Sequence, residues 1–192
     1  MKKLILASGS TYRRELLSRI VSSFDIQIPG VDEDAIKNSG RSPLQTACTL
    51  ASMKADAVAA LNPSAIVIGS DQLVDLNGVI LGKPGTPEQC CRQLTAMSGR
   101  THRLITAVCV RTDTHSFEFT ELTELQMRSL SPAEIQRYVE RDAPMDCAGS
   151  YRIEAAGIAL FRSIRTTDST AIIGLPLLRL SRILRELGVS IP

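Results

Sequence analysis

The fold is first indicated by the segment Leu4-Ile5-Leu6-Ala7-Ser8-Gly9-Ser10-Thr11-Tyr12-Arg13-Arg14-Glu15-Leu16-Leu17. Its apolar start predicts a short buried strand over residues 4–7, and the spacing of the apolar residues that follow predicts a helix over 13–20. A hydroxyl-rich loop that leads into a helix offers unbonded N–H groups and the positive end of the helix dipole, which together can hold a phosphate. The guanidinium of Arg13 could add a bidentate contact to the same oxygens. We therefore expect a phosphorylated small molecule to bind at this loop.

Further along the chain, strands and helices alternate, with an antiparallel portion in the middle. Asn77-Gly78 stands between two apolar stretches of the segment 73–80 and predicts a hairpin. The pattern predicts an α/β fold with a mixed, twisted sheet flanked by helices, built as a single domain over residues 1–192. The expected strands cover 24–28, 65–68, 103–111, 116–127 and 157–164, and the expected helices cover 43–61, a segment that begins at Thr86-Pro87-Glu88, 131–141 and 176–187.

Composition excludes several classes of protein. Among the 192 residues, 44% are hydrophobic, which is enough for a packed core and argues against disorder. The formal net charge of +2 is too balanced for a nucleic-acid-binding surface. No apolar run approaches the roughly 18 residues of a membrane span, and the apolar run at residues 4–7 is too short for a secretory signal. We expect a cytoplasmic protein that binds neither nucleic acid nor membrane.

Two carboxylates follow apolar segments, where α/β sheets form their ligand clefts. Asp71 comes directly after Ile66-Val67-Ile68-Gly69-Ser70, so the end of that strand would present its carboxylate. Glu33 lies in the acidic loop 29–34. Brought together, the two would suit a hard divalent cation such as Mg²⁺. The alternatives are that Asp71 is an ordinary turn residue and that Glu33 is a solvated loop charge.

Three more charged residues are candidates for a binding site. Lys83 lies in the rigid turn Gly82-Lys83-Pro84-Gly85, and Lys54 is placed on a helix otherwise rich in Ala and Leu. With Arg13 they would neutralise a triphosphate, although exposure of Lys83 and snorkelling of Lys54 are equally ordinary. Glu154 follows a run of small residues at 146–151 and could equally be a solvated acid.

Several common motifs are absent from the sequence: the P-loop string, the dinucleotide fingerprint and a Ser-His-Asp arrangement. The five cysteines match neither a disulfide framework nor a zinc site.

An ordered set of short motifs covers nearly the whole chain and resembles the Maf family of nucleoside triphosphate pyrophosphatases. The set is Ser8-x-Ser10-x-x-Arg13-Arg14, Val31-Asp32-Glu33, Lys54, Gly69-Ser70-Asp71-Gln72, Gly82-Lys83-Pro84, Ser98-Gly99-Arg100-Thr101 and Ala148-Gly149-Ser150-Tyr151. The resemblance implies a Maf/inosine-triphosphatase-like fold, a cytoplasmic location and a particular chemistry. That chemistry is cleavage of a nucleoside triphosphate between its α- and β-phosphates with a divalent cation, Mg²⁺ or Mn²⁺.

The resemblance also implies roles for individual residues. Asp71 would be the catalytic acid/base residue, and Glu33 would hold the metal together with Asp71. The phosphates would be bound by Ser8, Ser10, Arg13, Lys54 and Lys83. The resemblance further implies a homodimer. Such chemistry depends mainly on positioning and on charge stabilisation, which this residue set could supply.

The base specificity implied by the resemblance rests on Tyr12, Gln72 and Glu154. The dTTP- and UTP-cleaving branch typically has Arg, Thr and Gln at these positions, so the chain is more similar to the 7-methyl-GTP branch, whose members usually carry Trp at position 12. Because N7-methylation makes guanine cationic, an aromatic face would attract it by roughly 0.5–2 kcal/mol, and a carboxylate can accept hydrogen bonds from its N1–H and amino group. The alternatives are a dTTP/UTP pyrophosphatase and a nucleotide-binding regulator of cell division.

Overall fold

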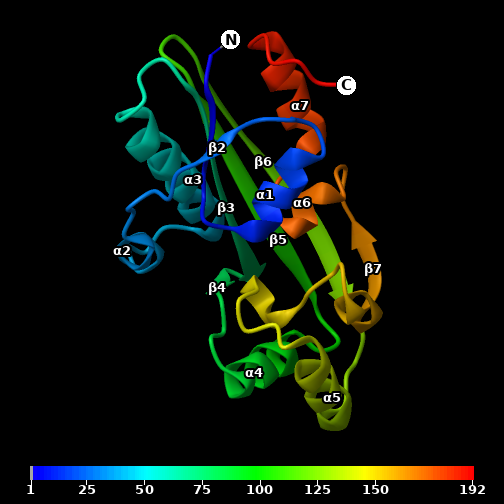
Figure 1. Cartoon of the computed structure of the whole chain (residues 1–192). Coiled ribbons are helices and arrows are strands. Elements are labelled where there is room, and N and C mark those ends of the chain that lie inside the picture. Colours follow the sequence, from blue (N-terminus) through cyan, green and yellow to red (C-terminus); the bar gives the residue numbers. More distant parts are fainter. Residues whose placement is uncertain (1) are drawn as a thin grey trace. The chain divides into compact units, whose positions relative to one another are not determined.

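The computed structural model of the chain describes residues 2–192, which form two compact units (Figure 1). The first unit consists of residues 2–71, 106–121 and 168–192, and the second consists of residues 72–105 and 122–167. Three long strands contribute residues to both units. The expectation of one domain over residues 1–192 stays a prediction.

Within residues 2–192, seven strands form one sheet, and the main path of the sheet has the order β2-β1-β3-β5-β6-β7. Strand β1 pairs in parallel with β2 and β3, whereas β4 pairs with β3 and β7 pairs with β6 in the antiparallel sense. The mixed α/β sheet expected from the sequence is therefore confirmed. The strands are β1 (Leu4–Ala7), β2 (Asp25–Ile26), β3 (Ile66–Leu76), β4 (Val79–Leu81), β5 (Thr101–Arg111), β6 (Ser116–Met127) and β7 (Phe161–Arg165).

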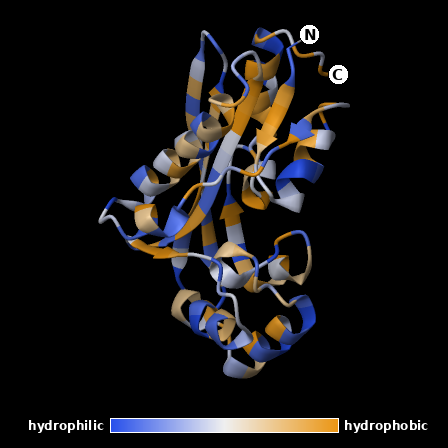
Figure 2. Cartoon of the chain, turned by 60° about the vertical axis from the view of Figure 1, so that its left-hand side comes forward, coloured by the Kyte–Doolittle hydropathy of each residue, from blue (hydrophilic) through white to orange (hydrophobic). Residues whose placement is uncertain are grey.

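The core of the first unit follows from the two-residue alternation of its strands. Leu4 and Leu6 of β1 point to one face of the sheet, where they join a buried apolar cluster with the helices at the two ends of the chain. Ile5 and Ala7 point to the other face and pack with Val58. Both faces are thus covered, and Figure 2 shows hydrophobic residues, in orange, along strands of the sheet. The helices of this unit are α1 (Thr11–Ser18), α2 (Glu33–Lys37), α3 (Pro43–Ala59), α6 (Thr170–Ile173) and α7 (Leu177–Glu186).

The second unit contains the hairpin that the sequence predicts. Asn77 and Gly78 both have positive φ, 54° and 88°, as the tight turn between β3 and β4 requires. Helices α4 (Pro87–Met97) and α5 (Pro132–Asp142) pack against each other. Each begins with a proline after a capping hydroxyl, which explains why both starts were visible in the sequence. Two 3₁₀ turns complete the unit, η1 (Ala148–Ser150) and η2 (Ala156–Leu160).

Three local expectations were wrong. Strand β3 continues to Leu76 instead of ending near Ile68, so Asp71 lies within a strand. Residues 156–160 form η2, and β7 begins only at Phe161. Glu33 opens the short helix α2 instead of lying in a loop, because the side chain of Asp32 caps that helix by accepting from the N–H of Ala35.

Candidate functional site

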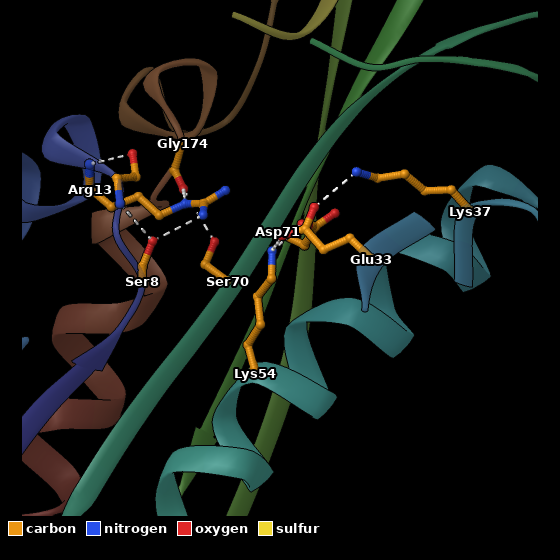
Figure 3. A network of polar contacts seen from close by, with 9 residues as sticks. Ser8, Arg13, Glu33, Lys37, Lys54, Ser70, Asp71 and Gly174 are labelled. Atoms are coloured by element: carbon orange, nitrogen blue, oxygen red, sulfur yellow. Dashed lines mark hydrogen bonds and ion pairs between the residues drawn. The ribbon is translucent and has the colours of Figure 1, made fainter. Parts of the chain in front are cut away.

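The predicted phosphate loop connects β1 to α1. Ser10 caps α1 by accepting from the backbone N–H of Arg13 at 3.4 Å, and the Arg13 guanidinium turns back toward the loop. Its Nη1 donates to Ser8 Oγ at 3.3 Å, and its Nε donates to the carbonyl oxygen of Gly174 at 3.0 Å (Figure 3). Burial lowers the pKa of Arg13, and the negative charges of Asp71 and Glu33 oppose that shift. The structure therefore brings Ser8, Ser10 and Arg13 together, as the sequence predicts.

Lys54 lies between the two predicted carboxylates. Its Nζ is 2.6 Å from Glu33 Oε1 and 2.7 Å from Asp71 Oδ1, so one ammonium joins α2 to β3 (Figure 3). Lys54 is buried, and Asp71 is only 4% exposed. Buried charges need such partners, because an isolated charge taken out of water costs several kcal/mol. The snorkelling alternative for Lys54 and the turn alternative for Asp71 are both excluded by these positions.

Gly69 allows α3 to approach β3 closely enough for this contact. A Cβ at Gly69 would lie 2.3 Å from the carbonyl oxygen of Ala51 and 2.6 Å from the backbone nitrogen of Ala55. Both atoms belong to the backbone of α3, so any larger residue would push the helix away from the strand. Lys54 lies on the same stretch of α3, between Ala51 and Ala55. This close approach explains why glycine precedes Ser70 and Asp71.

Glu33 has two cationic partners. Its Oε1 accepts from Lys54, and its Oε2 accepts from Lys37 at 2.8 Å, one helical turn further along α2. Burial would raise the pKa of Glu33, but the hydrogen bonds from Lys37 and Lys54 outweigh burial and lower this pKa to about 2. Glu33 is therefore an ionised, partnered carboxylate near neutral pH. Lys37 was missed in the sequence, because its spacing from Glu33 matters only once residues 33–37 are known to be helical.

The same pair of carboxylates is suited to a divalent cation. Among the described residues, Asp71 Oδ2 is buried and has no hydrogen-bond partner, while Oδ1 is bonded to Lys54. Mg²⁺ binds through one or two carboxylates and completes its shell with waters and substrate phosphates. Within residues 2–192, no group of three or more His, Cys, Asp and Glu side chains could by itself hold a metal ion. The donor set thus fits a cation that is held jointly by Glu33, Asp71 and a bound phosphate.

The remaining predicted site residues differ in exposure and in the unit to which they belong. Tyr12 is half-buried on α1 in the first unit. In the second unit, Gln72 is half-buried on β3, and Lys83 is exposed in the turn after β4. Glu154 is exposed, and its Oε1 lies 3.4 Å from Nε of Arg152. Its loop is compact, because a Cβ at Gly157 would lie 2.3 Å from the carbonyl oxygen of Arg152.

Comparison with known families shows which family the chain belongs to. A family model described as Maf-like protein matches residues 3–187. The chain belongs to the Maf-like family. The family resemblance inferred from the sequence motifs is thus confirmed. No helix within residues 2–192 has the length and apolar character to cross a membrane.

Curated relatives of the Maf-like chain share its full length. A protein of Xanthomonas oryzae pv. oryzae (strain MAFF 311018) named 7-methyl-GTP pyrophosphatase is 52% identical over 192 residues, covering 100% of both chains. A protein of Bdellovibrio bacteriovorus with the same name is 48% identical, covering 96% of this chain and 97% of the relative. Among solved structures, a HAM1 protein from Coxiella burnetii is similar with a TM-score of 0.51, covering 97% of this chain and 100% of that one. At 15% identity, that likeness supports the fold alone.

Proposed function

We propose that the chain hydrolyses the α–β phosphoanhydride of 7-methyl-GTP, giving 7-methyl-GMP and pyrophosphate. The observation that carries this proposal is the full-length match at 52% identity to a protein named for that activity. The cluster of Lys54, Glu33 and Asp71 supports it, because the Lys54 ammonium lies 2.6 Å from the Glu33 carboxylate and 2.7 Å from the Asp71 carboxylate.

In the proposed reaction, Asp71 is the general base. Its Oδ2 has no hydrogen-bond partner among the described residues, so it can accept a proton from a water that attacks the α-phosphorus. The new bond joins the water oxygen to the α-phosphorus, and the bond from that phosphorus to the bridging oxygen breaks, with pyrophosphate as the leaving group. Lys54 keeps the Asp71 carboxylate in place through the 2.7 Å contact to Oδ1.

The cations of the chain would neutralise the phosphates. Arg13 presents a planar guanidinium with five N–H donors, of which two are engaged with Ser8 and Gly174. Ser8 and Ser10 lie in the same loop, and the resemblance assigns Lys83 to the phosphates as well. A divalent cation, Mg²⁺ or Mn²⁺, held by Glu33 and Asp71 would supply Lewis-acid stabilisation of charge on the phosphate oxygens.

Base selection is proposed for Tyr12, Gln72 and Glu154. The carboxylate of Glu154 would accept from guanine N1–H and its amino group, whereas thymine and uracil offer one N–H between two carbonyls that a carboxylate repels. The Tyr12 ring would favour a cationic base. Arg152, at 3.4 Å, is the present partner of Glu154 and would share that carboxylate with the base.

Pyrophosphate release from a panel of triphosphates tests the proposal. With Mg²⁺ or Mn²⁺ present, kcat/KM should be highest for 7-methyl-GTP and lower for GTP, dTTP and UTP. Equal turnover of dTTP or UTP would favour the other branch of the family. Replacing Glu154 by glutamine should narrow the ratio of kcat/KM between 7-methyl-GTP and UTP by about tenfold, since one charge-assisted pair is worth about 1.4 kcal/mol or more. An unchanged ratio would remove Glu154 from base selection.

Two further expectations rest on the family resemblance. We propose a cytoplasmic homodimer that acts on a small-molecule nucleotide, and light scattering at micromolar concentration measures the mass of the assembly directly.

A regulator of cell division with incidental hydrolysis would behave differently. If the protein acts mainly as such a regulator, cells that carry only the Asp71→Asn variant should divide normally. If it acts as an enzyme, the Asp71→Asn variant should lose its activity in cells.

A further inference from the structure

One backbone carbonyl in the first unit contacts two residues next to the proposed chemistry. The oxygen of Gly174 accepts from Arg13 Nε at 3.0 Å and from Ser70 Oγ at 3.2 Å (Figure 3). Arg13 is the proposed phosphate contact, and Ser70 precedes the proposed base. Ser70 is fully buried, so its hydroxyl depends on this acceptor. The position of a single carbonyl therefore bears on both residues.

The loop that carries Gly174 is closed by Asp168 and Thr170. Asp168 Oδ1 accepts from the Thr170 backbone N–H at 2.9 Å and from Thr170 Oγ1 at 2.5 Å, and Asp168 Oδ2 accepts from the Leu178 N–H at 2.7 Å. Thr170 Oγ1 accepts in turn from the Leu177 N–H at 2.9 Å. These bonds join the two ends of the loop 168–178. Asp168 is 5% exposed, so water competes little for its oxygens.

The same bonds complete the start of α7. Its first N–H groups, those of Leu177 and Leu178, need acceptors, and the capping position is held by Pro176, which makes no side-chain hydrogen bond. Thr170 and Asp168 supply both acceptors from an earlier part of the chain. Gly174 has φ 131°, a conformation that favours glycine, and this allows the chain to turn between α6 and α7.

We propose that Asp168 and Thr170 are positioning residues that orient the Arg13 guanidinium for a phosphate by fixing the Gly174 carbonyl. The assignment rests on the proposed function, because Arg13 is the group it serves. With Nε bonded to Gly174 and Nη1 bonded to Ser8, the plane of the guanidinium is set before a ligand arrives. A side chain that is already immobilised loses less entropy on binding, and this corresponds to a several-fold gain in affinity.

Thr170→Val tests the role of the loop, since valine keeps the shape and removes the hydroxyl. We expect the Kd for inorganic tripolyphosphate, measured by calorimetry, to rise about fivefold to tenfold. The KM for 7-methyl-GTP should rise similarly with little change in kcat, because the contact acts on bound phosphate in the ground state as well. Thr170→Ser keeps the hydroxyl and should restore both values. Asp168→Asn provides the same measurement if Thr170→Val does not fold.

Thr46→Val is the matched control. Thr46 is a buried threonine of the same unit whose Oγ1 donates to the carbonyl oxygen of Ser42 at 3.0 Å, an acceptor outside residues 168–178. Its loss should lower the melting temperature while the Kd for tripolyphosphate stays at the wild-type value. If Thr170→Val behaves in the same way, the loop is merely structural and the proposal is overturned.

A double-mutant cycle separates positioning from general loss of structure. Arg13→Lys lacks Nε, so Thr170→Val should raise the Kd for tripolyphosphate by less than twofold in that background. An equal rise in both backgrounds contradicts the proposal, as does the absence of tripolyphosphate binding by the wild-type chain. If the wild type binds tripolyphosphate with the expected dependence on Thr170 but does not cleave 7-methyl-GTP, the proposed function fails and the positioning role stands.

Discussion

The first unit holds a cluster of charged side chains with partners of opposite sign around Lys54, whereas an aromatic cluster around His102 in the second unit buries titratable groups in their neutral form. Lys54 joins Glu33 and Asp71 in the first unit, and cationic hydrogen bonds lower the pKa of Glu33 to about 2 although burial opposes this. In the second unit, burial lowers the pKa of His102 to about 4, and burial is also the main cause that raises the pKa of Tyr151.

The difference shows what each cluster can do. Neutral His102 contacts the Tyr151 hydroxyl at 3.2 Å and packs between Tyr151 and Phe161, with ring centroids at 5.6 and 5.9 Å. Such a cluster contributes packing and an edge-to-face aromatic pair. The charged cluster instead keeps ionised groups at close range in a poorly solvated place, which is the condition for electrostatic catalysis. The contrast can be tested by removing one group at a time.

The largest effect is expected from Asp71→Asn, which keeps the shape of the side chain but removes the proposed base. The kcat for pyrophosphate release from 7-methyl-GTP should fall by about 10²- to 10⁴-fold, the usual contribution of a positioned general base. Asp75→Asn is the control, since Asp75 is equally buried on the same strand but bonds Arg103 at 2.6 Å. That variant should lose stability and keep kcat, and a similar loss of kcat in both variants would contradict the assignment.

Lys54→Met should have the next largest effect, because it leaves the buried Asp71 carboxylate without its cation. Breaking a buried pair on one side costs about 3–5 kcal/mol of unfolding free energy, which urea denaturation can measure. Lys37→Met removes the other partner of Glu33, but that lysine is 31% exposed, so the loss should stay near 1 kcal/mol or below. Equal losses in the two variants would show that burial does not distinguish the two contacts.

Gly69→Ala tests whether close approach of α3 and β3 maintains the charged cluster. The new Cβ would overlap backbone atoms at 2.3 and 2.6 Å, so the helix has to move, at a cost of about 1–3 kcal/mol. Turnover should fall as well, because Lys54 moves with the helix. Gly30→Ala is the control, since a Cβ there meets nothing within 4 Å. If Gly69→Ala and Gly30→Ala have the same stability and the same kcat, the steric argument is refuted.

The smallest effect concerns the neutral cluster and its dependence on pH. The pKa of His102 is about 4 in the folded chain and about 6.5 when unfolded, so the unfolded state binds more protons between these values and stability falls as pH drops. From pH 7 to pH 5.5 the loss should be about 1 kcal/mol. His102→Gln should flatten this part of the curve, whereas exposed His115→Gln should not. Parallel curves for wild type and His102→Gln would show that His102 does not titrate in this way.

Local signals in the sequence predicted local features of the fold. The Asn77-Gly78 turn and the capping box at Ser131 each depend on a few neighbouring residues, and both are present. Helix α2 escaped prediction because it has five residues, none of them buried, and so shows no apolar periodicity. The end of β3 was misplaced because Ser70 and Asp71 look like turn residues until their partners, Gly174 and Lys54, are known.

The candidate site was only partly predictable for the same reason. The ordered motifs indicated Ser8, Arg13, Glu33, Lys54 and Asp71, and the structure brings these residues together in one unit. The Lys37 contact and the Gly174 carbonyl were not predicted. Lys37 requires knowledge of α2, and Gly174 lies 161 positions from Arg13 in the chain, a separation that no local pattern reports.

The two carboxylates that contact Lys54 belong to elements that differ greatly in burial: Asp71 to the buried strand β3 and Glu33 to the short helix α2, which has no buried residue. Amide hydrogens of β3 and of the adjoining part of α3 are buried where backbone meets backbone, so they should exchange with solvent only when the unit opens globally. Helix α2 has five residues and none is buried, so its amides should exchange through frequent local opening. Glu33 should therefore separate from Lys54 more readily than Asp71 does, and faster amide exchange in α2 than in β3 would reveal the difference.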